Sequence, residues 1–359
     1  MKYTYYFAAL SIAASKKNAL VHDFYSSRGA YMATKSQLKE RPYLTAEDIG
    51  KILDKNARKN LDRDYEAMLK KGIKLVSYTD PDYPSRLKYN PEAPFALFYL
   101  GSLPKENGLK VGIVGARKCS VYGQTVSYEI GKSLGNAKVD VISGMALGVD
   151  CFSQRGALEG GGASFAVLGC GVDICYPASN RKLYEDLKER GGIISEYAPG
   201  TGGQSMFFPA RNRIISGLSD AVVLVEARKR SGSLITADHA LEQGRDIYCV
   251  PGRLMDDLSY GTNELIRQGA GIIVSKEGLL SDLGLIEDLK MAKTQSKLRL
   301  EKNKKKIYDS LSLDPVDVSV LIEKTGLPLN VLVIELPELC EMGLVKETFK
   351  NCYVRCPSK

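Results

Sequence analysis

Cationic and hydroxyl-bearing side chains stand beside glycines at several points where a short apolar run ends. One such segment reads GARKCSVYG at residues 115–123, and another reads RKRSGS at residues 228–233. Glycines let a ligand approach the backbone closely, and the amides at the start of a helix favour an anion. Arginine can hold a phosphate through two parallel N–H bonds. These turns therefore predict the binding of a phosphate-bearing ligand.

A third cationic segment reads FFPARNRII and places two arginines near the start of a helix whose first turn contains Pro209. The helix dipole prefers anions at this end, so Arg211 and Arg213 are electrostatically misplaced there. A bound anion, or a carboxylate such as Glu196 or Glu226, would correct this. An internal salt bridge is the alternative explanation for one of these arginines, and we do not expect it to account for both.

Other turns after apolar runs carry small polar residues. Ser143 and Gly144 follow one run, where Asp150 either caps the next helix or holds the loop, and Ser179 or Asn180 is expected to cap a later helix. Each turn alone is a weak signal, because glycine turns after strands are common. Four strand ends that all favour anions form a much more specific pattern.

Residue types for acid–base or metal chemistry are sparse in these segments. The chain has two histidines, His22 and His239, and neither lies in a turn described above. Its eight cysteines lack CxxC spacing and are expected to be reduced thiols. There is no G-x-G-x-x-G dinucleotide pattern. We predict no metal site, no cofactor and no catalytic residues.

The elements that position these turns alternate between short apolar runs and helical segments. Runs that are apolar almost throughout are typical of strands buried on both faces. Their alternation with helices predicts a doubly wound, Rossmann-like parallel sheet, in which ligands bind at the carboxyl ends of the strands. The expected strands are Lys110–Val114, Val139–Ile142, Ser164–Leu168, Gly192–Ser195, Ala221–Val225, Ile247–Val250 and Gly271–Val274.

Smaller regions flank this α/β region. We expect a helical domain at 1–75, in which Thr45 and Asp48 resemble a capping box, and the Rossmann-like domain at 76–285. A charged linker is expected at 286–302. Residues 303–359 predict three helices, at Lys304–Leu311, Pro315–Thr325 and Pro328–Glu341, followed by a two-stranded ribbon, an order that resembles a winged helix. Pro337 is expected to kink the third helix.

The net charge of +8 over 359 residues is unevenly distributed. Residues 1–100 carry +6 and residues 286–306 carry +5, whereas residues 101–285 sum to zero and residues 307–359 carry −3. An anion site in the α/β region must therefore be a local cluster. No stretch approaches 18 apolar residues, so we expect no membrane span and a cytoplasmic location.

Five motifs in this order resemble the DNA-processing protein A (DprA/Smf) family: VGIVGARKCSVYG, ISGMALGVD, FFPARNRIISGLSD, EARKRSGSLITADHALEQGRDIYCVPG and YGTNELIRQGA. The resemblance covers residues 75–275 and extends more loosely to a sterile-alpha-motif-like N-terminus and a winged-helix-like tail. It implies an extended Rossmann fold in a non-enzymatic, homodimeric recombination mediator. Such a protein binds and protects single-stranded DNA and loads the RecA recombinase in natural transformation or recombinational repair. Gln154 stands where the family often has histidine.

The turns and the resemblance together define a candidate site for single-stranded DNA. The resemblance matches Gly115, Arg117, Ser120, the Ser143–Gly144 turn and the Arg211–Arg213 segment. The predicted phosphate-binding residues are Gly115, Arg117, Lys118, Ser120, Gly123, Ser143, Gly144, Arg211, Asn212, Arg213, Arg230, Ser231, Gly232 and Ser233. Four aromatic residues are candidates for base stacking, namely Tyr122, Tyr197, Phe207 and Phe208, although core or rim packing is the plainer interpretation of Phe207 and Phe208.

An enzyme on a similar scaffold is the alternative hypothesis. Nucleoside-monophosphate phosphoribohydrolases of the lysine-decarboxylase-like group carry a PGGxGTxxE motif. Residues 199–203 read PGTGG, but the order differs and the following Gln204-Ser205-Met206 supplies no glutamate. The absence of histidine from the turns also disfavours general base catalysis near neutral pH.

Overall fold

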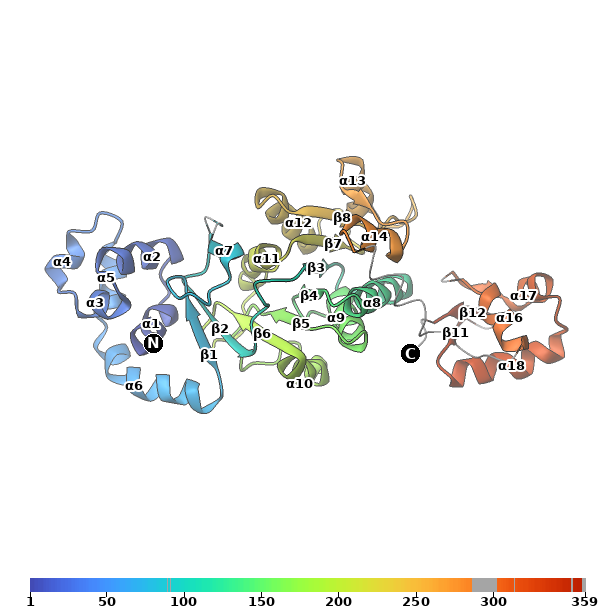
Figure 1. Ribbon diagram of the computed structural model, residues 1–359, viewed down its shortest axis with the longest axis horizontal. Coiled ribbons are helices and arrows are strands. Elements are labelled where there is room, and N and C mark those ends of the chain that lie inside the picture. Colours follow the sequence, from blue (N-terminus) through green and yellow to red (C-terminus); the bar gives the residue numbers. More distant parts are fainter. Residues whose placement is uncertain (89, 91, 286–301, 313, 350, 357–359) are drawn as a thin grey trace.

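The computed structural model describes residues 1–88, 90, 92–285, 302–312, 314–349 and 351–356. Its centre is a nine-stranded sheet with the order β1-β2-β6-β5-β4-β3-β7-β8-β9. Strands β3 to β9 are mutually parallel where they pair, which confirms the doubly wound α/β prediction (Figure 1). They span Lys110–Val114, Asp140–Ser143, Ser164–Val167, Gly191–Ser195, Ala221–Leu224, Asp246–Cys249 and Gly271–Ile272.

The chain reverses its direction of travel across the sheet at β3. From β3 it proceeds through β4, β5 and β6 on one side, and then returns to place β7, β8 and β9 on the other side. The carboxyl ends of β3 and β7 therefore form the topological switch point, where open α/β sheets bind their ligands. Val111 of β3 pairs with Ala221 of β7, so the turns that follow these two strands are neighbours.

Two strands at one edge were not predicted. Strand β1 (Lys74–Ser77) pairs antiparallel with β2 (Ala96–Gly101), and β2 pairs antiparallel with β6. These two antiparallel strands extend the predicted parallel sheet at this edge. The proline-rich turns between β1 and β2 obscured the alternation of strands in the sequence, while the antiparallel edge lets the chain enter the sheet without a crossover helix.

Helices cover both faces of the sheet. One apolar cluster joins α11 and α12 to the sheet through Ile214, Ile215 and Ala237, and another joins α8, α9 and α14 to the opposite face through Leu134, Ala157 and Leu279. The helices are α8 (Val121–Asn136), α9 (Val149–Glu159), α10 (Arg181–Arg190), α11 (Phe207–Leu218), α12 (Gly232–Glu242), α13 (Tyr260–Arg267) and α14 (Lys276–Asp282), with a 3-10 turn at Ala178–Asn180.

Helices α8 and α9 approach each other unusually closely. A Cβ atom at Gly131 or Gly135 of α8 would lie 2.1 or 2.2 Å from a carbonyl oxygen of α9, and one at Gly156 of α9 would lie 2.1 Å from a carbonyl oxygen of α8. Only glycine permits this backbone contact. Because α8 follows β3 and α9 follows β4, the contact fixes the two turns at the starts of these helices relative to each other.

The N-terminal region is helical, as predicted, and packs directly on the sheet (Figure 1). The Thr45–Asp48 capping box is confirmed, since each residue's side chain accepts the other's backbone amide. Tyr5 packs edge-on against Phe98 of β2, with 6.1 Å between ring centroids. The helices are α1 (Lys2–Ala9), α2 (Ala14–Asp23), α3 (Ser27–Met32), α4 (Lys35–Lys39), α5 (Ala46–Ile52) and α6 (Lys55–Lys70), and α7 (Ser85–Lys88) lies between β1 and β2.

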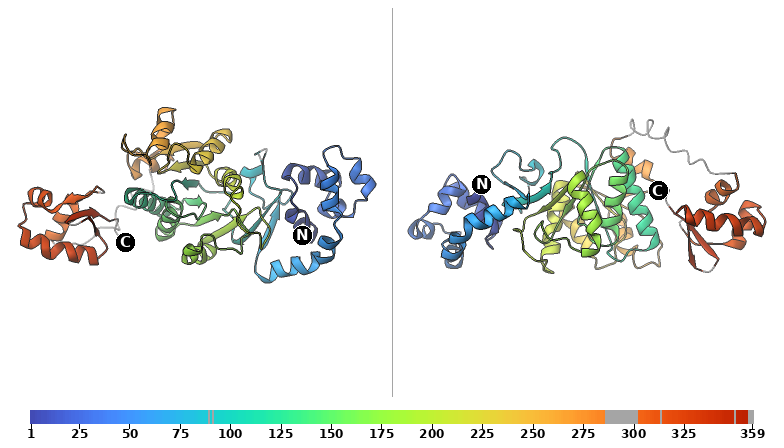
Figure 2. Two further views of the ribbon diagram at one scale, coloured as in Figure 1. Left: turned by 180° about the vertical axis from the view of Figure 1, so that it is seen from behind. Right: turned by 90° about the horizontal axis from the view of Figure 1, so that it is seen from below.

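The C-terminal region has its own core and lies at the end of the molecule opposite to the N-terminal helices (Figure 2). Its elements are α16 (Lys302–Ser310), β10 (Val316–Asp317), α17 (Val318–Thr325), α18 (Leu329–Glu341), β11 (Val345–Phe349) and β12 (Cys352–Arg355). Strand β10 was not predicted and makes the ribbon a three-stranded sheet. It delays the start of α17 to Val318, and α18 continues as one helix across Pro337.

The predicted charged linker lies outside the described residues except for Lys302. Among the residues that the structure describes, no helix is both long enough and apolar enough to cross a bilayer.

Candidate nucleic-acid interface

A cleft of about 310 Å³ opens at the switch point of the sheet. Four segments far apart in the sequence form its walls: the turns after β3 and β4, the first part of α11, and the start of α12. The residues that line the cleft are Val114, Gly115, Arg117, Ala146, Asp150, Phe208, Pro209, Arg211, Asn212, Ile215, Ser231, Gly232, Ser233 and Thr236.

The structure brings part of the predicted site together in this cleft. The predicted residues that line it are Gly115, Arg117, Phe208, Arg211, Asn212, Ser231, Gly232 and Ser233. The other predicted residues lie outside it, namely Lys118, Ser120, Gly123, Ser143, Gly144, Arg213, Arg230, Tyr122, Tyr197 and Phe207. Of these, Lys118 and Arg230 are exposed in the turns that flank the cleft, without an ion pair among the described residues.

Arg117 presents an exposed guanidinium at the mouth of the cleft. Its Cζ lies 5.3 Å from the centroid of the Phe208 ring, a cation–π contact that orients the side chain. Within the described part of the chain, the Arg117 side chain has no ion pair and no hydrogen bond. The same ring lies 5.2 Å from the ring of Tyr176. Arg117 is therefore oriented by an aromatic surface while its N–H groups remain available to an anion.

A smaller recess of about 70 Å³ adjoins the cleft beside these aromatic rings. Leu147 and Tyr176 contribute to its lining and are each about half exposed, at 47% and 48%. Phe208, Arg117 and Arg211 border both hollows. Leu147 and Tyr176 were not among the predicted site residues, and the signal that could have found Tyr176 is an aromatic residue in a polar turn after a strand. The recess offers apolar surface next to the cationic cleft.

The start of α12 contributes hydrogen-bond donors and hydroxyl groups. Ser231 is the N-cap and accepts the amide of Ser233 at 3.3 Å, while the two hydroxyls lie 2.8 Å apart. Gly232 has open space where a Cβ atom would be. Asn212 of α11 donates to the Gly232 carbonyl at 3.2 Å and so ties the two helices together. A backbone amide at this helix start can donate a hydrogen bond to a phosphate oxygen bound in the cleft.

Arg211 lines the floor of the cleft but serves mainly as an internal brace. It is 4% exposed, and its Nη1 donates to the carbonyl of Gly144 at 2.9 Å and to the carbonyl of Val167. Gly144 in turn donates its amide to Asp150 at 3.1 Å. Burial lowers the pKa of Arg211 and raises the pKa of Asp150, and each charge partly offsets this effect on the other. Asp150 thus holds the loop, which was one of its two predicted roles.

Arg213 does not line the cleft and instead forms an ion pair with Glu196. Its Nη2 and Nη1 donate to the two carboxylate oxygens of Glu196, at 2.7 and 3.1 Å. An internal salt bridge thus accounts for Arg213 but not for Arg211, which agrees with the expectation that it would not explain both arginines. Arg211 is satisfied by carbonyl groups and the neighbouring Asp150, and Arg213 by Glu196, so α11 needs no bound anion.

The start of α8 is occupied by a carboxylate of the protein itself. Glu226, 2% exposed after β7, accepts the Ser120 amide at 2.9 Å through one oxygen and the Ser120 hydroxyl through the other. A Cβ atom at Gly123 would lie 2.5 Å from Glu226. The interpretation of Ser120 and Gly123 as an open phosphate site is corrected accordingly. The helix dipole attracts an anion here as predicted, but the anion is internal.

Ser143 and three of the aromatic candidates make hydrogen bonds or packing contacts within the protein. The Ser143 hydroxyl donates to the Ile113 carbonyl at 2.6 Å and joins β4 to β3. Tyr197 stacks on Phe207 with 4.1 Å between ring centroids, so Phe207 follows the packing interpretation. Tyr122 packs against the apolar cluster beneath α8. Among the four aromatic candidates, only Phe208 lines the cleft.

Several residues singled out in the sequence lie away from the cleft or have another role than expected. Asn180 does not cap α10 with its side chain, which instead donates to the Met145 carbonyl at 2.9 Å and supports the turn after β4. Gln154 is fully buried and donates to the Phe165 carbonyl at 3.1 Å, away from the cleft. The PGTGG segment does not line the cleft. In the described ranges, no group of three His, Cys, Asp or Glu residues is arranged to hold a metal ion.

Comparison with known proteins supports the resemblance seen in the motifs. The family model of DNA recombination-mediator protein A matches residues 74–284. DNA processing protein DprA of Streptococcus pneumoniae is 40% identical over 206 residues, which cover 57% of this chain and 73% of that protein. DprA of Bacillus subtilis is 37% identical over 224 residues, which cover 62% of this chain and 75% of that protein.

Two solved structures share the fold. The structure of DprA from S. pneumoniae superposes with a TM-score of 0.63 at 32% identity and covers 78% of this chain and 97% of its own. DNA processing protein A from Helicobacter pylori, whose single-stranded DNA binding mode has been described structurally, superposes with a TM-score of 0.54 at 28% identity. That match covers 59% of this chain and 95% of the other. The chain therefore belongs to the DNA recombination-mediator protein A family, which is the DprA/Smf family.

Proposed function

We propose that the protein is a non-enzymatic mediator that binds single-stranded DNA in the cleft, protects it, and transfers it to the RecA recombinase. The observation that carries this proposal is the exposed Arg117 guanidinium, which lies over Phe208 and makes no ion pair or hydrogen bond among the described residues. A fixed cation beside an aromatic ring suits a polymer that alternates phosphates with bases. Membership of the family supports a role in natural transformation or recombinational repair, and a homodimeric assembly.

The cleft and the recess divide the binding chemistry between them. Arg117, the Gly232 amide and the hydroxyls of Ser231 and Ser233 would contact phosphates, while Phe208 and Tyr176 would stack on a base. Stacking of a base on an aromatic ring contributes about 1–3 kcal/mol and requires an unpaired base. The H. pylori relative, a single-stranded DNA binder, is consistent with the same preference here. We therefore expect single strands to bind more tightly than duplexes.

The affinity for single strands should fall with salt. Each phosphate contact to a single strand contributes roughly −0.7 to the slope of log K against log salt concentration, so about three to five contacts predict a slope of about −2 to −3.5. Fluorescence anisotropy with labelled single-stranded and double-stranded oligonucleotides across a salt series measures both the slope and the preference.

The decisive substitution is Arg117→Ala. It removes one phosphate contact and the cation over Phe208, and we expect single-strand affinity to fall at least tenfold, equivalent to about 1.4 kcal/mol. Arg155→Ala is the matched control, because Arg155 is also exposed and also lies over an aromatic ring, 5.9 Å from Phe152. Unchanged affinity of Arg117→Ala, or an equal loss in both variants, would refute the assignment of the cleft.

A further inference from the structure

A second exposed surface lies on the same edge of the sheet as the cleft, in the loops that follow β7 and β8. We call it the outer strip and define it as Arg228, Lys229, Arg230, Leu254, Met255 and Tyr260. Strands β3, β7 and β8 are consecutive neighbours and parallel, so the loops after them emerge at one edge. At roughly 4.8 Å per strand, β8 lies about 10 Å from β3, which places the outer strip beside the cleft.

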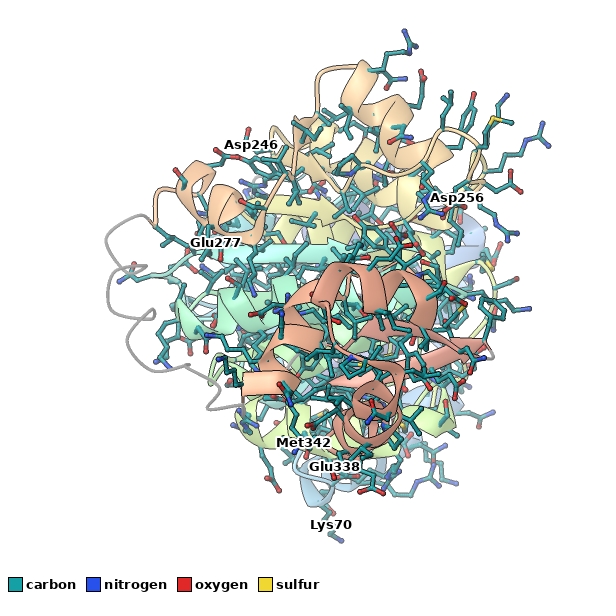
Figure 3. All side chains as sticks on the ribbon, turned by 90° about the vertical axis from the view of Figure 1, so that its right-hand side faces the viewer. Lys70, Asp246, Asp256, Glu277, Glu338 and Met342 are labelled. Atoms are coloured by element: carbon teal, nitrogen blue, oxygen red, sulfur yellow. The ribbon has the colours of Figure 1, made fainter. Side chains whose placement is uncertain are left out.

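Leu254 and Met255 are the most unusual residues of the outer strip. They are consecutive large apolar side chains that are 90% and 93% exposed. The base of their loop is firmly held, because Gly252 exchanges two hydrogen bonds with the Asn263 side chain, each of 3.1 Å. Asp256, labelled in Figure 3, accepts the Leu258 amide at 3.0 Å and closes the other side. The loop therefore holds two apolar side chains in water, which is unfavourable unless a ligand covers them.

The surroundings of these apolar residues are cationic. Arg228, Lys229 and Arg230 are all exposed and make no ion pair within the described ranges. Lys229 Nζ lies 5.3 Å from the centroid of the Tyr260 ring, which is 46% exposed. These side chains combine positive charge with an aromatic ring, as in the cleft.

The carboxylates near the outer strip do not cancel this charge. Glu264 pairs with Arg267, and Asp314 of the C-terminal region pairs with Arg253. Asp256 and Asp257 lie in the loop itself, and one oxygen of Asp256 is used by a backbone amide. The loops therefore carry three cations without ion pairs among the described residues, against two loop carboxylates. A single strand of nucleic acid carries phosphates and unstacked base faces. It therefore matches exposed cations beside apolar side chains better than an apolar protein surface does.

We propose that the outer strip is a second subsite for single-stranded DNA, which receives nucleotides of the same strand as they leave the cleft. Phosphates would contact Arg228, Lys229 and Arg230, while bases would pack on Leu254, Met255 and Tyr260. This inference rests on the proposed function, since it requires the cleft to hold the first part of the strand. Its consequence is that affinity depends on strand length beyond what the cleft alone accommodates.

The test compares short and long oligothymidylates on the full chain. A single binding module covers roughly 4–16 nucleotides, so strands of about 5 and about 20 nucleotides separate the cleft from the extended path. The double variant Leu254→Ser/Met255→Ser and the variant Lys229→Ala should each lose about fivefold to tenfold for the long strand and less than twofold for the short one. Tyr260→Phe should retain wild-type binding, whereas Tyr260→Ala should lose affinity for the long strand.

Matched controls come from the N-terminal helices. Leu69 is 51% exposed and Lys59 is exposed without an ion pair, so Leu69→Ser and Lys59→Ala report the general effect of losing an apolar or a cationic surface residue. Equal affinity of wild type and outer-strip variants for the long strand would overturn the inference while leaving the cleft intact. A change of mass in light scattering with unchanged DNA binding would also overturn it and assign the strip to a protein contact. Failure of the wild type to bind either strand would refute the proposed function itself.

Discussion

The two arginines of α11 are held by groups of the protein itself, whereas Arg117 is not. Replacing Arg211 should therefore lower the free energy of unfolding. Arg211 is joined to Asp150 through the backbone of Gly144, whose carbonyl accepts from the arginine and whose amide donates to the carboxylate. The substitution Arg211→Met removes the guanidinium but keeps much of its apolar volume. It leaves the carbonyls of Gly144 and Val167 without their donor and leaves Asp150 buried without the neighbouring positive charge.

The expected loss of stability follows from these groups. An unsatisfied buried acceptor costs about 1–3 kcal/mol, and removal of one member of a buried charge pair costs about 3–5 kcal/mol. These losses overlap, so we expect Arg211→Met to lower the free energy of unfolding by about 3–5 kcal/mol. The double variant Asp150→Asn/Arg211→Met removes both buried charges and should lose less than the sum of the single variants, with a coupling energy of about 1–3 kcal/mol.

The dependence on pH gives an independent check. Burial raises the pKa of Asp150 above its ordinary value, so its ionised form is a destabilising influence that grows as the pH rises through this raised pKa. Without Arg211 the pKa of Asp150 should rise further. The deficit of Arg211→Met should therefore shrink toward about pH 4, where the Asp150 carboxyl can be protonated, and the double variant should show no such change.

Urea denaturation followed by circular dichroism measures these differences. Amide hydrogen exchange over residues 143–150 reports locally on the loop, and it should lose protection in Arg211→Met. The role of Arg211 as an internal brace would be excluded if the stability of Arg211→Met stayed within about 0.5 kcal/mol of wild type, the usual range for surface substitutions, while single-strand affinity fell tenfold. That result would make Arg211 a DNA ligand and not a brace.

Three further outcomes follow from individual contacts. Glu226→Ala should destabilise the protein by about 1–3 kcal/mol in thermal unfolding, because it leaves the Ser120 amide and hydroxyl without their acceptor; a change below that range would contradict the internal-anion role. Gly144→Ala should cost about 1–3 kcal/mol, since its Cβ would lie 2.2 Å from a guanidinium nitrogen, and wild-type stability would show that the loop yields freely. The hydrogen bonds from Lys16 and Thr45 lower the pKa of Asp48 to about 2, so its stabilising contribution should be present above pH 4 and lost as the pH falls toward 2. Asp48→Asn should flatten this part of an acid-unfolding curve, and an unchanged curve would exclude the contribution.

Much of the fold could be predicted because the governing patterns are local. Each of the seven predicted strands overlaps an observed one, since a strand buried on both faces must be apolar over consecutive residues. The capping box of Thr45 was recognisable because its partner lies three residues away. Strand β10 escaped prediction because it is two residues long, and β1 and β2 because the proline-rich turns between them obscure the alternation of strands and helices. The pairing of these strands also depends on distant segments.

The meeting of the glycine turns at one edge of the sheet follows from the amino-acid sequence alone, because parallel strands joined by helices place all such turns at the carboxyl ends. The sequence also shows which side chains lie at that edge. Which of the cations stay free of internal ion pairs and hydrogen bonds depends on contacts that form when the chain folds. The partners of Ser120 and Arg211 are 106 and 67 residues away along the chain, and no local pattern reveals such contacts. The Arg117 guanidinium remains available to an anion because its contact in the folded chain is the Phe208 ring and not a buried hydrogen-bond acceptor.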